Sequence, residues 1–379
     1  MESPMKYFAA MEDHRKEGYV KHPMINIIAI SIAAVICGAE DWYDIEDYGK
    51  EKYEWLKTLL DLSEGVPSHD TYNRFFSLAN PQALERCFED WINAIANLSE
   101  GRIISIDGKT LRGSKRAGSD TFIHMVSAWC NANNMVLAQQ KVNDKSNEIT
   151  AIPVLLDLLV LKGCIVTIDA MGCQKEIAEK IADKQADYIL AVKGNQKFLL
   201  DDIEEAFSNA KSDDEYTLKE VDHGRIETRT AKVITDLDWI CSKQNWKKLA
   251  CIIMVFSTRI NKQTGVKEEA YRYYISSKKG TAKYFNHAVR AHWGIENKLH
   301  WMLDVSFKED SSKKQAENAA QNFSLLSKIA LNMIRNLPHD VTRGTKVISA
   351  KRKRKMAAWN NEYLLKILLS FNLNEMKTT

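Results

Sequence analysis

Two aspartates in this 379-residue sequence follow short apolar runs that are typical of β-strands. Residues 102–106 end at Asp107, and residues 164–168 end at Asp169. A side chain at a strand end projects from the edge of a sheet, where two carboxylates on neighbouring strands can share divalent cations. Such an oxygen-rich pair favours metal-dependent phosphoryl transfer. Either aspartate taken alone is better explained as the cap of a turn or helix, but two matching instances weaken that alternative.

A third carboxylate that could complete the site is Glu296, in residues 290–301 (RAHWGIENKLHW). At about 3.6 residues per turn, one helical face carries Trp293, Glu296, Asn297 and His300. That face is polar and aromatic, which is unusual for a plain core. The alternative is a surface helix with a solvated glutamate and packed tryptophans. The competing acids nearby are Asp304, Glu309 and Asp310.

The segments that must position these acids predict a mixed α/β fold. A three-strand meander is expected first, followed by strand, helix and strand in alternation, which implies a mixed sheet covered by helices. The expected strands are 102–106, 122–130, 135–142, 164–168 and 188–192, and the expected helices are 148–161 and 174–184.

The flanking regions indicate two domains. Residues 1–98 are predicted to form a helical N-terminal domain, and residues 99–379 a catalytic domain. Within the second, residues from 198 to about 276 are rich in β-segments (227–234, 250–258, 271–275), and helices are expected at 282–303, 313–336 and 361–369.

Composition narrows the class of protein. With 45% hydrophobic and 27% charged residues the chain is ordinary globular material, and a net charge of +3 means that any nucleic-acid contact must be local. The basic run 351–355 is interpreted as a solvated face. Seven scattered cysteines indicate reduced thiols in an intracellular protein. The longest apolar run, 24–37, is shorter than the roughly 20 residues of a membrane span, so neither a transmembrane helix nor a signal peptide is expected.

Several long motifs resemble one family. Residues 106–113 (IDGKTLRG), 167–174, 191–196 (AVKGNQ), 223–229 (HGRIETR) and 292–301 together resemble the H-repeat-associated family of insertion-sequence transposases, of the DDE type. Residues 65–74 (GVPSHDTYNR) are similar to the signature of that family's N-terminal associated domain. The resemblance covers nearly the whole chain. It implies an RNase H-like core, a β-rich insertion before the glutamate helix, and Asp107, Asp169 and Glu296 as the catalytic, metal-binding triad.

One departure concerns the third acid. The broader set of insertion-sequence transposases often carries Tyr-x2-Arg-x3-Glu-x6-Lys, whereas Val289, His292 and Leu303 stand at those positions here. The assignment of Glu296 therefore rests on the narrower family. The candidates for the missing phosphate contacts are Arg290, His292, Asn297 and His300.

The resemblance implies a transposase that cleaves DNA at the ends of an insertion element and transfers the strand, using two divalent metal ions, Mg²⁺ with Mn²⁺ as a substitute. Its partners would be terminal inverted repeats and target DNA, bound by a homo-oligomer, with no membrane. Its location would be cytoplasmic and nucleoid-associated. The alternatives are a domesticated or inactive relative acting as a metal-dependent nuclease or as a non-catalytic DNA-binding protein, and a structural protein whose acids only cap turns.

Basic and amide residues near the acids are the remaining candidates for DNA binding. The alternative for the first two groups is an exposed loop with solubilising charge, and for the third a hairpin held by salt bridges with Glu227 or Asp222. The candidates are Lys109 and Arg112 after the first aspartate, Lys193, Asn195 and Gln196 after another strand, and His223, Arg225 and Arg229 in the insertion.

Overall fold

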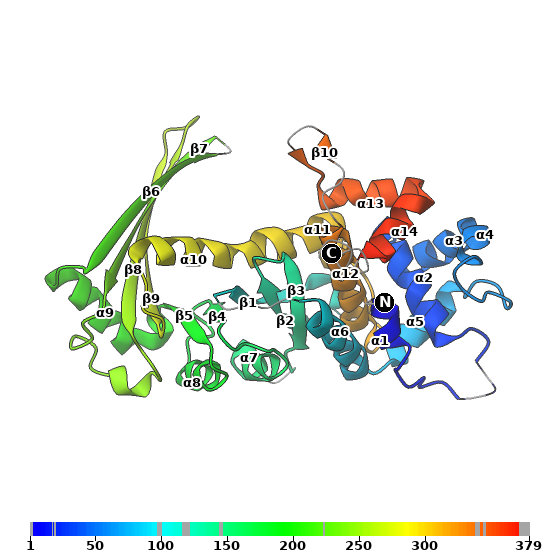
Figure 1. Cartoon of the computed structure of the whole chain (residues 1–379), viewed down its shortest axis with the longest axis horizontal. Coiled ribbons are helices and arrows are strands. Elements are labelled where there is room, and N and C mark those ends of the chain that lie inside the picture. The colour runs from blue at the N-terminus through cyan, green and yellow to red at the C-terminus, as the bar shows by residue number, and fades with distance from the viewer. Residues whose placement is uncertain are drawn as a thin grey trace, which may run out of the picture.

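The computed structural model describes residues 3–16, 18, 20–96, 101–115, 122–143, 147–222, 224–337, 342–343 and 346–370. Figure 1 shows an elongated molecule with long strands at one end, helices from both ends of the chain at the other, and shorter strands with helices between them. Helix α10 (Ala282–Gly294) runs along the molecule from the long strands toward the helical end. Because α10 leads directly to Glu296, the arrangement carries that residue to the middle of the molecule.

The middle part contains the meander and the alternating elements that the sequence predicts. Strand β1 pairs antiparallel with β2 and parallel with β4, and β4 pairs parallel with β5. This mixed, RNase H-like sheet confirms the predicted fold class. The strands are β1 (Ile103–Leu111), β2 (Ile123–Cys130), β3 (Met135–Lys141), β4 (Ile165–Ile168) and β5 (Asp187–Val192).

Two helices pack beside this sheet, α7 (Glu148–Asp157) and α8 (Lys175–Asp183). In α8 the buried residues Ile177, Ala178 and Ile181 follow helical spacing, so one apolar stripe faces the core. Both helices agree with the predicted ones, although α7 ends four residues earlier than expected. The two helices thus cover the part of the sheet in which β4 and β5 lie beside β1.

The β-rich segment extends the same sheet. Strand β9 pairs antiparallel with β5, so core and insertion form one nine-stranded sheet in the order β3-β2-β1-β4-β5-β9-β8-β7-β6. The predicted insertion is thus confirmed, but two of its elements, helix α9 and strand β6, were missed. Strand β6 lies at the edge of the sheet, and its many charged residues suit an exposed edge but hide the alternation typical of a strand. The elements are α9 (Lys197–Asn209), β6 (Asp214–Asp222), β7 (Arg225–Ile234), β8 (Cys251–Asn261) and β9 (Lys267–Ser276).

The two ends of the chain share one hydrophobic core, which runs from Phe8 to Ile367. Helix α2 (Met24–Cys37) is apolar nearly all round and lies at its centre, as expected of a buried helix. A smaller second core lies between the insertion strands and α10. The helices that share this core with α2 are α3 (Trp42–Glu51), α5 (His69–Leu78), α6 (Pro81–Ile95), α12 (Ala319–Asn336), α13 (Ala350–Trp359) and α14 (Asn361–Leu368).

In the described part of the chain no single helix is long and apolar enough to cross a membrane. By length and composition alone, α2 and α3 could do so as a pair, bent by 95° between them.

The basic run 351–355 is a solvated face only in part: Lys351, Arg352 and Lys355 are exposed, as expected, but the two residues between them are not. Lys353 and Arg354 are buried on α13, and their side chains bond to backbone carbonyls. The Lys353 Nζ donates to the carbonyl of Ile334 at 3.1 Å, and the Arg354 guanidinium donates to that of Val35 at 2.9 Å. Both acceptors lie in the last turns of helices, where carbonyls have spare capacity to accept a side-chain donor.

Two predicted helices also differ from the structure. The helix expected over 313–336 begins at residue 319, because residues 307–318 form an irregular segment with a 3₁₀ turn at Glu309–Ser311. The helix expected over 282–303 is interrupted after α10 by a π-helical turn, Ile295–His300, and continues as α11 (Trp301–Ser306). All seven cysteines are unpaired, in agreement with reduced thiols.

Candidate active site

Asp107 and Asp169 lie side by side on β1 and just beyond β4. The parallel pairing of these strands ends at Ile106 opposite Ile168, so the next residue on each is an aspartate. Asp107 does not end its strand, as the sequence suggested, because β1 continues beside β2 as far as Leu111. The two carboxylates still reach the same edge, since β4 stops there.

Glu296 comes to this edge from the π-helical turn. It shares a hydrogen bond with Asp107, and the His300 Nδ1 lies 3.5 Å from the Asp107 Oδ2 and 3.9 Å from the Glu296 Oε2. One ligand atom from each of these three residues lies within 4.8 Å of the others. The competing acid Asp304 is engaged elsewhere, with its Oδ1 2.6 Å from the Lys109 Nζ. The geometry therefore favours Glu296 over Asp304 as the third acid.

The carboxylates are crowded. Burial raises the pKa of Asp107 to about 8, and the charge and hydrogen bond of Glu296 and the charge of Asp169 act in the same direction. Burial also raises the pKa of Asp169, together with the charge of Glu148. Asp169 in addition accepts a hydrogen bond from the backbone N–H of Met171 at 3.0 Å. It therefore caps a turn and also belongs to the site.

A cleft of about 310 Å³ opens on these acids. Lys193, Arg272 and Trp293 are among its other lining residues. The donor set fits a divalent cation: carboxylate oxygens are the ligands that hard cations prefer, and positive charge would relieve the repulsion that raises the pKa of Asp107. The buried Nε2 of His300 has no hydrogen-bond partner, so this ring can also orient toward a ligand.

The two histidines proposed for phosphate contacts are neutral. Burial lowers the pKa of His292 to about 4 and that of His300 to about 3. The His292 Nδ1 is hydrogen-bonded to the Thr167 hydroxyl at 3.0 Å, and that hydroxyl donates to Ser105 at 3.2 Å. His292 thus joins α10 to β4 and β1, and neither ring supplies the charge of the Arg and Lys in the broader family pattern.

The candidates after β5 divide into two kinds. Lys193 is exposed at the rim of the cleft. Asn195 and Gln196 instead hold the turn that follows Asp169: the Asn195 Nδ2 donates to the carbonyl of Ala170 at 2.7 Å, and the Gln196 Nε2 to that of Cys173 at 2.9 Å. These two side-chain amides therefore stabilise the backbone conformation of the turn that follows Asp169.

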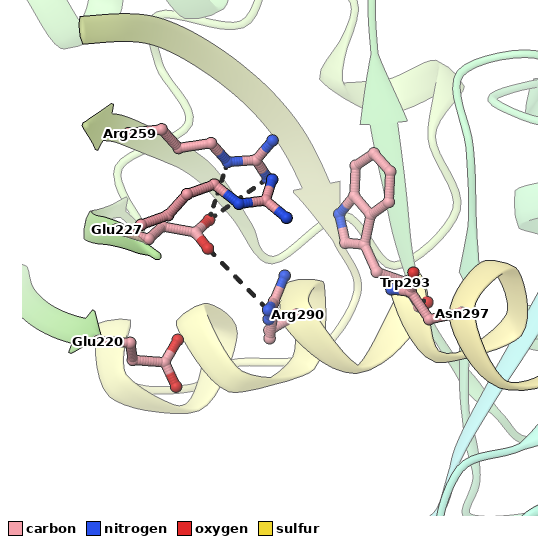
Figure 2. Close-up of a pocket in the computed structure, with 7 residues that line it drawn as sticks. Glu220, Glu227, Arg259, Arg290, Trp293 and Asn297 are labelled. Carbon is pink, nitrogen blue, oxygen red and sulfur yellow. Dashed lines mark hydrogen bonds and ion pairs between the residues drawn. The ribbon is translucent and has the colours of Figure 1, made fainter. Parts of the chain in front are cut away.

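A second cavity, of about 530 Å³, lies between the insertion strands and α10 (Figure 2). Glu227 is at its centre, 3.4 Å from Arg259 and 4.0 Å from Arg290. Burial alone would raise the pKa of Glu227, but the charges of these arginines and of Arg229 hold it below its ordinary value. The cavity is lined by Glu220, Arg225, Glu227, Arg259, Arg290, Trp293 and Asn297.

The contacts of Arg229 agree with the alternative to DNA binding, in which this residue holds a hairpin by salt bridges. It is buried, 2.6 Å from Glu220 and 3.4 Å from Glu227. Arg225 and Asn297 line the cavity as exposed residues, and Arg112 is exposed 3.5 Å from Asp310. His223 lies outside the described residues. Lys109 is enclosed by acids, as described below.

Sequence reasoning missed Arg259 and Arg272. The Arg259 side chain lies against Glu227, and the Arg272 guanidinium lies 5.7 Å from the Trp293 ring centroid. The available signal was the two-residue alternation along β8 and β9, which places alternate side chains on one face of a strand. Which face of these two strands packs against α10 could not be predicted from the sequence, because it depends on the order of strands in the sheet.

The fold defines an RNase H-like domain with three acids meeting at one edge of its sheet, and comparison with known proteins identifies its family. Residues 98–333 match the family described as "Transposase DDE domain", and residues 5–92 match the one described as "DDE_Tnp_1-associated". The chain therefore belongs to the DDE transposase family, and among its relatives are H-repeat-associated members.

Relatives cover the whole chain. It is 45% identical over 393 aligned residues to "Putative transposase YncI" of Escherichia coli O157:H7, covering 100% of this chain and 98% of the relative. It is 40% identical to "H repeat-associated putative transposase YhhI" of Escherichia coli K12, covering 98% of each. A shorter relative, "Inactive transposase YbfQ" of the same strain, is 40% identical over 73 residues, 19% of this chain and 87% of that protein.

Proposed function

We propose that this transposase cleaves DNA at the ends of an insertion element and joins the freed strand to target DNA. The observation that carries the proposal is the convergence of Asp107, Asp169 and Glu296 in one cleft. These residues would hold two divalent cations, Mg²⁺ or Mn²⁺. When bound, such a pair activates an attacking oxygen and stabilises the leaving oxygen of a phosphodiester.

The chain's own residues would orient this chemistry. Asp107 and Glu296 approach from β1 and from the helix, and Asp169 from beyond β4, so a phosphate in the cleft would be surrounded by ligands on rigid elements. His300, as a neutral ring beside Asp107, would hold that carboxylate in position. The His292–Thr167 hydrogen bond would keep the helix against the sheet.

DNA would be bound by the exposed candidates. Lys193 at the rim of the cleft and Arg112 beyond β1 would contact phosphates near the reacting bond. Arg225, Arg290 and Asn297 would contact the same strand farther along, in the second cavity. Two copies of the chain would be needed to bring two element ends together, and binding to chromosomal DNA would place them at the bacterial nucleoid.

The test is cleavage and strand transfer on DNA that carries the element's end. Asp107→Asn, Asp169→Asn and Glu296→Gln should each abolish Mg²⁺-dependent cleavage and preserve DNA binding. Glu176→Gln, on the exposed face of α8, is the matched control and should react normally. Cutting by Asp107→Asn at the normal rate would show that the triad is wrong.

A second substrate distinguishes the alternatives. With a pre-cleaved end, the proposed transposase joins the 3′-hydroxyl to target DNA. Cleavage without any joining would identify a nuclease, and DNA binding with neither reaction would identify a non-catalytic DNA-binding protein.

A further inference from the structure

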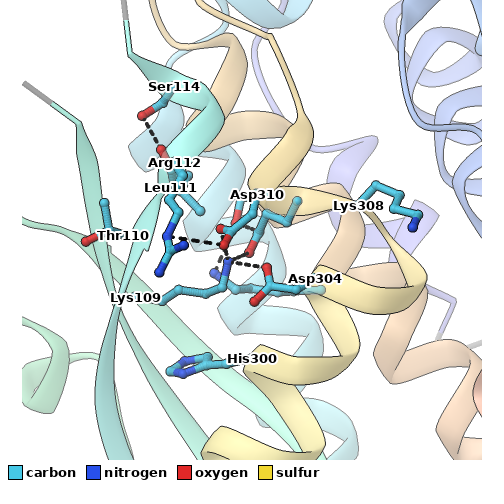
Figure 3. Close-up of polar contacts among 12 residues, drawn as sticks. Lys109, Thr110, Leu111, Arg112, Ser114, His300, Asp304, Lys308 and Asp310 are labelled. Carbon is cyan, nitrogen blue, oxygen red and sulfur yellow. Dashed lines mark hydrogen bonds and ion pairs between the residues drawn. The ribbon is translucent and has the colours of Figure 1, made fainter.

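Lys109 lies among three carboxylates (Figure 3). Its Nζ is 2.6 Å from the Asp304 Oδ1, 2.9 Å from the Asp310 Oδ1 and 3.0 Å from the Glu309 Oε2. Its side chain is only 10% exposed. A phosphate would have to displace these partners, or approach through their negative charge, to reach the ammonium group. The local charge therefore opposes a DNA contact by Lys109.

Lys109 stands two residues after Asp107 on β1, and alternate residues of a strand point to the same side of the sheet. Asp107 meets Glu296 and His300 on the facing helix, and Lys109 meets Asp304 farther along it. Figure 3 shows His300 and Asp304 both pointing toward β1. Strand β1 and the facing helix are thus in contact at two successive positions along the strand: at Asp107, through the candidate catalytic acids, and at Lys109, through an ion pair.

The π-helical turn makes the two contact positions match. Glu296 and Asp304 are eight residues apart, which in a regular helix of 3.6 residues per turn would leave them about 80° apart around the axis. A π-helical turn holds one more residue than an α-helical turn, because its hydrogen bonds span five residues instead of four. The turn at Ile295–His300 therefore rotates Asp304 back toward the face that carries Glu296.

We infer that Lys109 is a positioning residue: its ion pair with Asp304 fixes the helix that carries Glu296 against β1 and so sets the separation of Glu296 from Asp107. The inference rests on the proposed function of the acids. It replaces a phosphate contact by Lys109 with a contact inside the protein.

Two of the acids around Lys109, Glu309 and Asp310, belong to the irregular segment 307–318. Glu309 is buried, and its Oε1 accepts a hydrogen bond of 2.6 Å from the Ser324 hydroxyl on α12. A Cβ at Gly113, just beyond β1, would lie 1.8 Å from the Ser312 carbonyl oxygen. The segment is therefore pressed against the end of β1, so Lys109 is held in a rigid surrounding rather than on a free loop.

Lys109→Met should separate positioning from phosphate binding. Under the inference, Mn²⁺ binding measured by calorimetry weakens about 10-fold and kcat of cleavage falls at least about 10-fold, while KM for DNA is unchanged. The slope of log K for DNA against log salt concentration also stays the same. Lys193→Met, at a proposed phosphate contact, is the matched comparison and should reduce that slope by about 1.

Two further variants keep the test independent of folding. Lys109→Arg should restore most of the Mn²⁺ affinity, because it keeps the charge. Asp304→Asn should reproduce the loss seen in Lys109→Met, and the double variant should be no worse than either single one. Wild-type Mn²⁺ affinity in Asp304→Asn, or a reduced salt slope with unchanged kcat in Lys109→Met, would overturn the inference.

Failure of the proposed function would look different. If wild-type protein bound no Mn²⁺ and cut no DNA, the triad would be at fault. The position of the helix can then be followed by amide hydrogen exchange over residues 295–306, which Lys109→Met should accelerate in metal-free protein. Unchanged exchange there would overturn the inference independently.

Discussion

The burial of Asp107 beside two other carboxylates predicts that Asp107→Asn makes the metal-free protein more stable. In the folded chain the pKa of Asp107 is about 8, against an ordinary value of 3.8. At pH 7 the folded state must therefore keep a proton that the unfolded chain has released. Asparagine has a similar shape and can donate to Glu296, but it carries no charge to bury.

The magnitude follows from the difference in pKa. At about 1.4 kcal/mol per unit, the penalty at pH 7 is at most about 4 kcal/mol. For a chain of this size each kcal/mol raises Tm by roughly 2–4 °C. The sign with pH is fixed: below about pH 4 both states are protonated, and between pH 4 and 8 only the unfolded state is ionised. Wild-type stability therefore falls over that window relative to the variant.

The assay is thermal and urea unfolding of both proteins in a chelating buffer from pH 4 to 8, with Asp47→Asn on the exposed face of α3 as control. Mg²⁺ should then stabilise the wild type by mass action and leave the variant unchanged. If Asp107→Asn melted at or below the wild-type temperature throughout this range without metal, burial and the neighbouring acids would not raise the pKa of Asp107, and the reasoning would be refuted.

Three other predictions concern stability. Gly113→Ala should cost about 1–3 kcal/mol in urea unfolding, because its Cβ meets the Ser312 backbone, whereas Gly194→Ala has open space and should be near neutral; equal effects would contradict the close approach. Arg354→Met should cost about 1–3 kcal/mol by removing a buried hydrogen bond from a charged donor to the Val35 carbonyl, and an unchanged midpoint would return this residue to the solvated face. Burial lowers the pKa of Lys328 from 10.5 to about 8. Between these pH values the unfolded state binds more protons than the folded state, so wild-type stability rises with pH. This rise amounts to up to about 3 kcal/mol and should be missing in Lys328→Met; parallel curves of stability against pH for the two proteins would refute the prediction.

The sequence was sufficient to predict that Asp107 and Asp169 meet. Both follow apolar strand patterns, and the corresponding ends of neighbouring parallel strands lie at one edge of a sheet. Helix α2 was equally readable from its apolar run. These features depend on residues close together in the chain.

The choice between Glu296 and Asp304 depended on a helix that is not regular, so a period of 3.6 could not decide it. The partners of Lys109 are also out of reach of local patterns, since Glu309 is 200 residues away. A lysine after a strand predicts a phosphate contact equally well until the acids around it are known. Arg354 shows the same limit, because its acceptor belongs to α2, at the other end of the chain.

The π-helical turn also changes how motif spacing should be compared between relatives. In a regular helix the residue seven places after the glutamate completes two turns, and here that residue is Leu303, which is buried. With one additional residue in the turn, the position that returns to the glutamate's face is the eighth, Asp304. A relative with a regular helix should therefore be compared at its seventh residue after the glutamate with the eighth residue here, if the two are to lie on the same helical face. Where the broader pattern carries a positive charge on this helix, this chain carries an acid at the eighth position, paired with Lys109 on the facing strand.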